Sequence, residues 1–185
     1  MSSKGMNRRQ FLQTSGLAAA GAAAVASGTL LIAADGAWAL ELGSLSAEEG
    51  LALLTMTRRI YPHDTLADIY YAGVVEALDK EAKENGETAR LLKDGLDELD
   101  GAMGMKWSEL SDGNQLAVLT ALSSGGFFQK VRGTAIVALY NNPLVWRHFG
   151  YEGASYELGG YIERGFDDLN WTAAPPAEAS PAKAG

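Results

Sequence analysis

Apolar residues recur at spacings of three and four through the middle of the chain, a pattern typical of amphipathic helices. The first helix is predicted to open with the capping box Ser46-Ala47-Glu48-Glu49 and to run to about Ile60, because Pro62 stops the helical pattern. The second helix is predicted to begin near Leu66 and to end at Asn85-Gly86. Its apolar face comprises Leu66, Ile69, Tyr70, Val74, Ala77 and Leu78.

Three further helices are predicted between Glu87 and Tyr140. The helix from Glu87 carries its apolar residues on one side, and these are Leu91, Leu92, Leu96, Leu99 and Met103. The next helix is capped by Ser111-Asp112 and carries Leu116, Leu119 and Leu122. After a break over Ser123–Gly126, the helix from Phe127 to Tyr140 is apolar on almost every side, which makes it the candidate for the central helix of the domain.

The predicted fold is all-α, a small bundle of about five helices, because no segment shows sustained alternation of apolar and polar residues. Residues 40–149 are assigned to this helical domain. Asn141-Asn142-Pro143 breaks the fifth helix, and Pro143 suits the first position of a short helix through Val145 and Trp146.

The chain beyond this point is rich in aromatic residues and glycine. Between Tyr140 and Trp171 there are eight aromatic residues: Tyr140, Trp146, Phe149, Tyr151, Tyr156, Tyr161, Phe166 and Trp171. We expect residues 150–171 to form an extended strip that either wraps its own helical domain, as Trp146 and Phe149 favour, or docks on a partner through aromatic anchors. Residues 172–185 are rich in alanine and proline, a composition that predicts a disordered tail.

The N-terminal residues have the order of parts of a twin-arginine export signal. Arg8 and Arg9 are followed by Phe11 and Leu12, and then by a weakly apolar, uncharged run over residues 14–34. Ala37 and Ala39 form a small-x-small cleavage site, so residues 1–39 are the predicted signal and the mature chain begins near Leu40. The alternative is an uncleaved transmembrane anchor, since the run is long enough to cross a bilayer core.

Charge and composition narrow the classes of function. Residues 1–39 hold three basic residues and one acidic residue, so the predicted mature chain has 12 basic and 22 acidic residues and a net charge of −10. This acidity argues against nucleic acid and anionic membrane as partners. The chain has no Cys and two His, and it has no Gly-rich nucleotide-binding fingerprint, so we expect no cofactor or metal site in this chain. Because the twin-arginine route carries folded cargo, the cofactor-bearing cargo is predicted to be another polypeptide.

Several motifs, taken in order, resemble a known family. They are Arg59-Ile60-Tyr61-Pro62-His63-Asp64, then Leu139-Tyr140-Asn141-Asn142-Pro143 with Trp146, then Phe149-Gly150-Tyr151-Glu152-Gly153 and Gly159-Gly160-Tyr161. Together with the export signal, the chain resembles gluconate 2-dehydrogenase subunit 3, the small subunit of membrane-bound FAD-dependent sugar and sugar-acid dehydrogenases.

The resemblance implies a three-part complex in the periplasm, associated with the membrane. Its partners would be a large glucose-methanol-choline-type flavoprotein that binds FAD, a multihaem cytochrome c subunit, and the twin-arginine translocase. The small subunit would assist the maturation and export of the flavoprotein and would have no catalytic residues. The candidate partner-binding residues are Tyr61, Pro62, His63, Tyr140, Asn142, Pro143, Trp146, Tyr151, Tyr156, Tyr161, Phe166 and Trp171.

Two other functions remain open at this stage. One is a free-standing periplasmic hydrolase or metalloenzyme that uses His63, Asp64 and His148, although these residues have no spacing typical of a triad or metal site. The other is a small periplasmic binding module whose aromatic strip captures a sugar or a peptide. Arg58 and Arg59 are interpreted as a salt-bridging pair on the surface or toward a partner.

Overall fold

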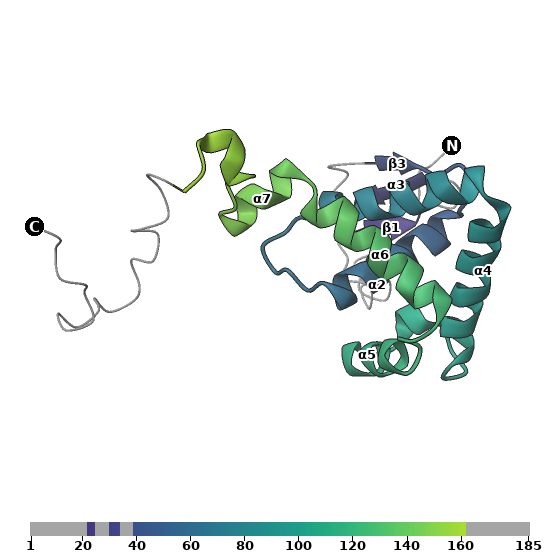
Figure 1. Cartoon of the computed structure of the whole chain (residues 1–185). Helices are drawn as coiled ribbons and strands as arrows, with labels where there is room; N and C mark the ends of the chain where they lie inside the picture. Colours follow the sequence, from purple (N-terminus) through teal and green to yellow (C-terminus); the bar gives the residue numbers. More distant parts are fainter. Residues whose placement is uncertain (1–21, 25–29, 34–38, 162–185) are drawn as a thin grey trace, which may run out of the picture.

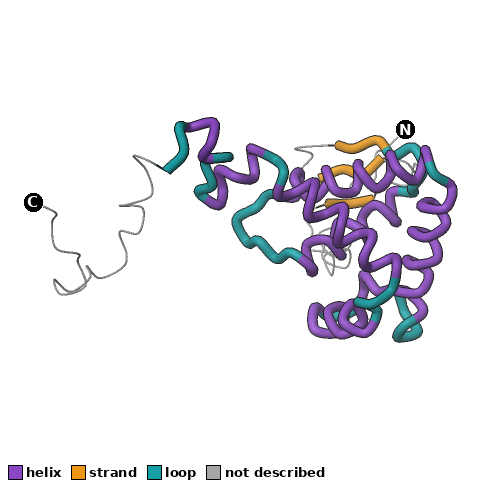
Figure 2. The backbone as a smooth tube through the Cα atoms, viewed as in Figure 1, coloured by secondary structure: helices purple, strands orange, loops and turns teal. Residues whose placement is uncertain are grey.

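The computed structural model describes residues 22–24, 30–33 and 39–161, and these residues form a mostly helical domain. Six α-helices lie in the described part of the chain, with two 3-10 helices and three short strands (Figures 1 and 2). The α-helices are α2 (Ala47–Ile60), α3 (Asp68–Glu84), α4 (Gly86–Gly101), α5 (Asp112–Ala121), α6 (Gly126–Tyr140) and α7 (Pro143–Phe149). The 3-10 helices are η2 (Trp107–Glu109) and η3 (Ser155–Leu158), and the strands are β1 (Ala22–Ala24), β2 (Leu30–Ala33) and β3 (Ala39–Glu41).

The helix ends follow local signals in the sequence. The Ser46 hydroxyl accepts a hydrogen bond from the Glu49 N–H, and the Glu49 carboxylate accepts one from the Ser46 N–H, so the predicted capping box is confirmed. Asn85 ends α3 and its side chain caps α4. Pro143 lies in the first turn of α7, as predicted.

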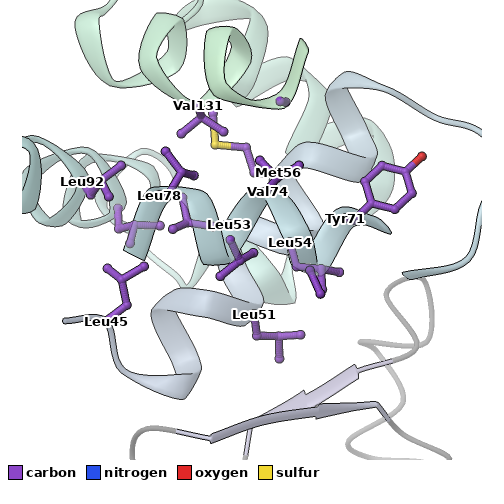
Figure 3. Packing of buried hydrophobic residues seen from close by; sticks show 14 of the residues in the cluster. Leu45, Leu51, Leu53, Leu54, Met56, Tyr71, Val74, Leu78, Leu92 and Val131 are labelled. Carbon is purple, nitrogen blue, oxygen red and sulfur yellow. The ribbon is translucent and has the colours of Figure 1, made fainter. Parts of the chain in front are cut away.

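The central element is α3, which packs against α2, α4 and α6, so the prediction that the helix from Phe127 is central was wrong. Helix α6 buries only one stripe, which includes Phe127, Val131, Ala135 and Leu139, and it leaves Ile136 and Val137 exposed. Buried side chains from α2, α3, α4 and α6 converge in one core (Figure 3).

The predicted apolar face of α3 was also partly wrong. Val74 and Leu78 are buried as expected, but Ile69 is exposed, whereas Tyr71 and Val75 are buried. The reason is that three helices surround α3, so its buried surface is wider than one stripe and is rotated relative to the predicted one.

Helix α4 contacts α6 closely because Gly95 faces Phe127. A Cβ atom added at Gly95 would lie 2.0 Å from a ring carbon of Phe127, so only glycine permits this approach. Of the predicted α4 face, Leu92, Leu96 and Leu99 are buried, Leu91 is half-buried and Met103 is exposed, contrary to the prediction.

The segment between α4 and α5 buries Trp107, which the sequence pattern did not indicate. The backbone N–H of Trp107 donates to the Asp100 carboxylate over 2.9 Å, and its indole N–H donates to the carbonyl of Gln115 over 3.2 Å. Gln115 in turn donates to the Trp107 carbonyl. In α5 itself the Ser111 side chain makes no capping hydrogen bond, and Leu116 is exposed, so these two expectations were wrong.

Three short strands form an antiparallel sheet in the order β1-β2-β3, contrary to the expectation of no strand. Leu31 is opposite Leu40, and Ala39 is opposite Ile32. Leu31 has no exposed surface and belongs to the core, while β1 and β2 contact α2. The alanine-rich sequence shows no alternation of apolar and polar residues, so it does not predict these strands, which are defined by their backbone pairing alone. The predicted boundary after Ala39 therefore falls inside β3.

Candidate functional site

The candidate site lies where the loop after α2 meets the ends of α6 and α7. Tyr61 and His63 from one predicted motif and Tyr140 from another come together here. His63 Nε2 and Tyr140 Oη lie 2.6 Å apart, within hydrogen-bond distance. The rings of Tyr61 and Tyr140 meet edge to face with centroids 5.6 Å apart. The ring of Phe149 from α7 covers His63 at 4.8 Å. We call Tyr61, His63, Tyr140 and Phe149 the aromatic cluster.

Tyr71 of α3 fixes the loop that carries Tyr61 and His63. Its hydroxyl donates to the Tyr61 carbonyl over 2.7 Å and accepts from the His63 N–H over 3.3 Å. Burial raises the pKa of the Tyr71 phenol, so this hydroxyl stays neutral and keeps its donor. The Arg58 guanidinium lies over the Tyr71 ring and pairs with Asp68 over 2.7 Å.

Arg58 and Arg59, which were interpreted as a salt-bridging pair, each form a salt bridge with an aspartate of this chain. Arg58 pairs with Asp68 and donates to the carbonyl of Leu66. Arg59 pairs with Asp112 and donates to the side-chain oxygen of Gln115 over 2.7 Å. Both arginines therefore hold elements of the helical body together.

Tyr140 also connects the helical body to α7. The Trp146 indole N–H donates to the Tyr140 carbonyl over 2.6 Å, and burial raises the pKa of the Tyr140 phenol. The side chain of Asn142 accepts from the N–H of Leu144 and so caps α7. Asn142 is therefore a structural residue of this junction.

Beyond α7 the chain leaves the helical body. Helix α7 packs against the end of α6, with Val145 in the core, and η3 lies away from the other helices (Figures 1 and 2). We call residues 143–161 the C-terminal arm. Its aromatic side chains are exposed: Phe149 by 44%, Tyr151 by 52%, Tyr156 by 91% and Tyr161 by 67%. The start of the arm packs on its own domain, because Val145 is buried in the core and Phe149 contacts His63, and Trp146 is half-buried. Tyr151, Tyr156 and Tyr161, the described aromatic residues beyond Phe149, are exposed and do not cover the helical body.

The arm has defined turns, where the sequence had indicated an extended strip. Gly150 ends α7 in the left-handed conformation with φ +73°, which favours glycine, and η3 interrupts the following residues. The rings of Trp146 and Tyr151 meet edge to face at 5.2 Å, so α7 and the chain after it are held together.

A cleft of about 460 Å³ opens on the arm. Its lining residues are Pro143, Trp146, Arg147, Gly150, Tyr151 and Glu152. The cleft combines two aromatic rings with one basic and one acidic side chain. Sequence reasoning named Pro143, Trp146 and Tyr151 but missed Arg147 and Glu152, because charged residues in a Gly-rich segment carry no signal of a shared cleft.

The two histidines have separate partners. His63 binds Tyr140, whereas His148 Nε2 lies 3.4 Å from the hydroxyl of Tyr70, with the two rings edge to face. Among residues 22–24, 30–33 and 39–161, no three His, Asp or Glu side chains lie close enough to hold a metal ion. Pro62 and Asp64 are exposed beside His63.

The remaining predicted site residues divide between exposed positions and positions beyond the described part. Arg8, Arg9, Phe11, Leu12, Ala37, Phe166 and Trp171 lie outside the described residues. Ala39 is exposed in β3. Within the described part of the chain, no helix is both long and apolar enough to cross a membrane.

Comparison of the chain with protein-family models, with curated proteins and with solved structures gives no match. The resemblance to the small dehydrogenase subunits therefore rests on the order of the sequence motifs alone.

Proposed function

We propose that this chain is a non-catalytic small subunit of a periplasmic FAD-dependent sugar or alcohol dehydrogenase of the glucose-methanol-choline type. In this proposal it assists the maturation of the flavoprotein, accompanies it through twin-arginine export and stays bound to it. The multihaem cytochrome c subunit joins through the flavoprotein. The observation that carries the proposal is the C-terminal arm, an exposed aromatic segment that leaves the helical body.

The arm has the character of a protein-binding surface. Tyr, Trp and Arg are enriched among the residues that dominate binding energy at interfaces, and the arm contains Trp146, Arg147, Tyr151, Tyr156 and Tyr161. Tyrosine rings contribute large apolar contact areas and lose little conformational entropy when they bind. Exposed apolar groups gathered in this way are typical of interaction sites on soluble proteins.

The export signal supports the choice of partner. The route is used by folded cargo, yet the sequence of this chain has no fingerprint of a cofactor site. A bound flavoprotein without its own signal would explain why such a small chain carries Arg8 and Arg9. The motifs around His63, Tyr140 and Tyr161 support the same family of complexes.

The docking role of the arm is tested with the double variant Tyr156→Ser and Tyr161→Ser. We expect its affinity for the proposed flavoprotein partner to fall at least about tenfold, because two exposed aromatic anchors are lost. The matched control is Met103→Ser with Leu116→Ser, which removes two exposed apolar side chains that lie outside the arm. Circular dichroism should show unchanged helix content for both. Equal affinity of the two double variants and the wild-type chain would refute docking through the arm.

The escort role is tested separately with Arg8→Lys and Arg9→Lys. We expect the flavoprotein to accumulate in the cytoplasm, as measured by its dye-linked activity in cell fractions. If the flavoprotein still reaches the periplasm at the wild-type level, the escort role is refuted while docking through the arm is unaffected.

The cleft on the arm supports a second candidate function, that of a periplasmic module that binds a sugar or a peptide. Its volume of about 460 Å³ lies within the range of small-molecule sites, and its rings from Trp146 and Tyr151 suit the apolar face of a sugar. Calorimetry of the isolated chain with aldoses, sugar acids and short peptides separates the candidates. Saturable binding without the flavoprotein would favour the module, and substrate turnover by the isolated chain would favour an enzyme based on His63, Asp64 and His148.

A further inference from the structure

Strands β1 and β2, which precede Ala39, contact the helical body directly. Leu31 of β2 has no exposed surface and belongs to the same core as Leu42 and Val75. A Cβ atom added at Gly50 of α2 would lie 3.7 Å from Leu31, 3.5 Å from Val75 and 2.7 Å from Leu42. Leu31 therefore lies over the first turns of α2 and closes this part of the core.

The predicted cleavage site lies in the same sheet. Ala39 is opposite Ile32 and Leu40 is opposite Leu31, so the bond between Ala39 and Leu40 is part of the β2–β3 ladder. Just after this ladder, the Asp79 carboxylate binds the backbone N–H groups of Gly43, Ser44 and Leu45. The backbone around the bond is thus held on one side by pairing and on the other by α3.

We propose that strands β1 and β2 are an integral part of the fold of the unprocessed chain, docked on α2 through Leu31. A protease must bind its substrate as a free extended segment, so the bond after Ala39 is shielded until β2 leaves the sheet. Removal of residues 1–39 uncovers the apolar surface formed by Leu42, Gly50 and Val75. The occupant of this surface before processing is the chain's own segment Leu30–Ala33.

The apolar character of the segment explains why it can serve two purposes. The run over residues 14–34 is uncharged and weakly apolar, as an export signal requires, and the same property permits burial against α2. The docking needs no partner, so it can be measured on the isolated full chain, and its failure would leave the accessory function untouched.

The first test measures hydrogen exchange in the full wild-type chain. We expect the amides of residues 30–33 and 39–41 to exchange at least about a hundredfold more slowly than in an unstructured peptide, because the ladder must open before they exchange. Exchange at the unstructured rate across residues 30–33 would overturn the proposal. This measurement requires no substitution and so does not depend on whether a variant folds.

The second test uses Leu31→Asp, which places a charge in the core, with Leu116→Asp as the control at an exposed leucine. Elastase cuts after alanine, and mass spectrometry follows the cut between Ala39 and Leu40. We expect this cut to be at least about tenfold faster in the Leu31→Asp chain than in the wild-type and control chains, because cleavage follows the population of the opened segment. Equal rates in all three chains would overturn the proposal. Complete loss of helix in the Leu31→Asp chain alone would support it, because a leader outside the fold would not affect the helices.

Discussion

The best test of how this fold is stabilised is the replacement of Asp79, a buried carboxylate on α3. Its two oxygens accept hydrogen bonds from three consecutive backbone N–H groups, those of Gly43, Ser44 and Leu45, over 2.8, 2.9 and 2.8 Å. These residues connect the sheet to α2, so Asp79 determines how the chain enters the helical domain. Asp79→Ala removes all three acceptors without adding volume.

The expected loss of stability follows from the exposure of the three donors. The Leu45 N–H is buried and would remain unpaired, whereas the other two are partly buried and can reach water. Hydrogen bonds to charged groups contribute about 1.5–3 kcal/mol, so with hydration of two donors we expect Asp79→Ala to lower the free energy of unfolding by about 3–5 kcal/mol. For a chain of this size each kcal/mol shifts the melting temperature by about 2–4 °C, which gives a decrease of about 10 °C.

The variant Asp79→Asn separates the loss of one hydrogen-bond acceptor from the loss of all of them. Asparagine keeps one oxygen that can accept from Ser44 and Leu45, but its NH₂ group would face the N–H of Gly43, so we expect a loss of about 1–2 kcal/mol. Thermal unfolding is followed by circular dichroism, with Asp97→Ala on the exposed side of α4 as the control, expected to be within about 0.5 kcal/mol of the wild type. A melting temperature of Asp79→Ala equal to that of the Asp97→Ala control would refute the reasoning.

Two more predictions concern contacts between helices. Gly95→Ala should lower the free energy of unfolding by about 1–3 kcal/mol in urea denaturation, because the added Cβ would overlap Phe127. In the control Gly101→Ala, in the same helix, the added Cβ meets no atom within 4 Å, so this variant should not be destabilised. Similar denaturation midpoints for the two variants would contradict the prediction. The Lys130 ammonium donates to the Glu81 carboxylate and holds the pKa of Glu81 below the usual value. The pair therefore stabilises the fold at pH values above about 4.3, the pKa of glutamate in the unfolded chain, and this contribution is lost as the pH falls through the lower pKa of the folded state. Glu81→Gln should therefore flatten the decrease in melting temperature between about pH 5 and pH 3, and an unchanged decrease would contradict this assignment.

The helix ends were predictable because they depend on neighbouring residues. The capping box at Ser46, the cap at Asn85 and the proline at position 143 act within one helical turn, so the sequence determines them locally. The all-α class follows from the same periodicity, which is long and regular between residues 46 and 140.

The buried faces were less predictable because they depend on the neighbours of each helix. In α3, Tyr70 and Tyr71 are adjacent and equally apolar, and only the arrangement of α2, α4 and α6 decides that Tyr71 is the buried one. Trp107 packs in the hydrophobic core, and Asp100 and Gln115 accept hydrogen bonds from its two N–H groups, an arrangement that no periodic pattern reveals. The burial of Leu31 was not predicted, because the residues around it have the pattern of an export signal and were therefore assigned to a segment outside the helical domain.

The candidate site was predicted as a group of residues but not as a geometry. His63 and Tyr140 are 77 positions apart in the chain, and their hydrogen bond arises only because α2 and α6 end at the same side of the domain. The turns of the arm are equally hidden in the sequence. Glycines at positions 150 and 153 indicate loss of helix, but the left-handed conformation that directs the chain is visible only in the structure.

Under the proposed function, the residues that position the arm have a different role from the exposed residues on it. His63 and Tyr140 are partly buried and hold Phe149 and Trp146, so they act as positioning residues for the start of the arm. Tyr156 and Tyr161 are mostly exposed, as anchors for another protein would be. Changes in the first group should therefore alter both stability and binding, whereas changes in the second should alter binding alone. That division is what a rigid domain with a preformed docking arm requires, because a segment ordered before binding loses less entropy when its partner arrives.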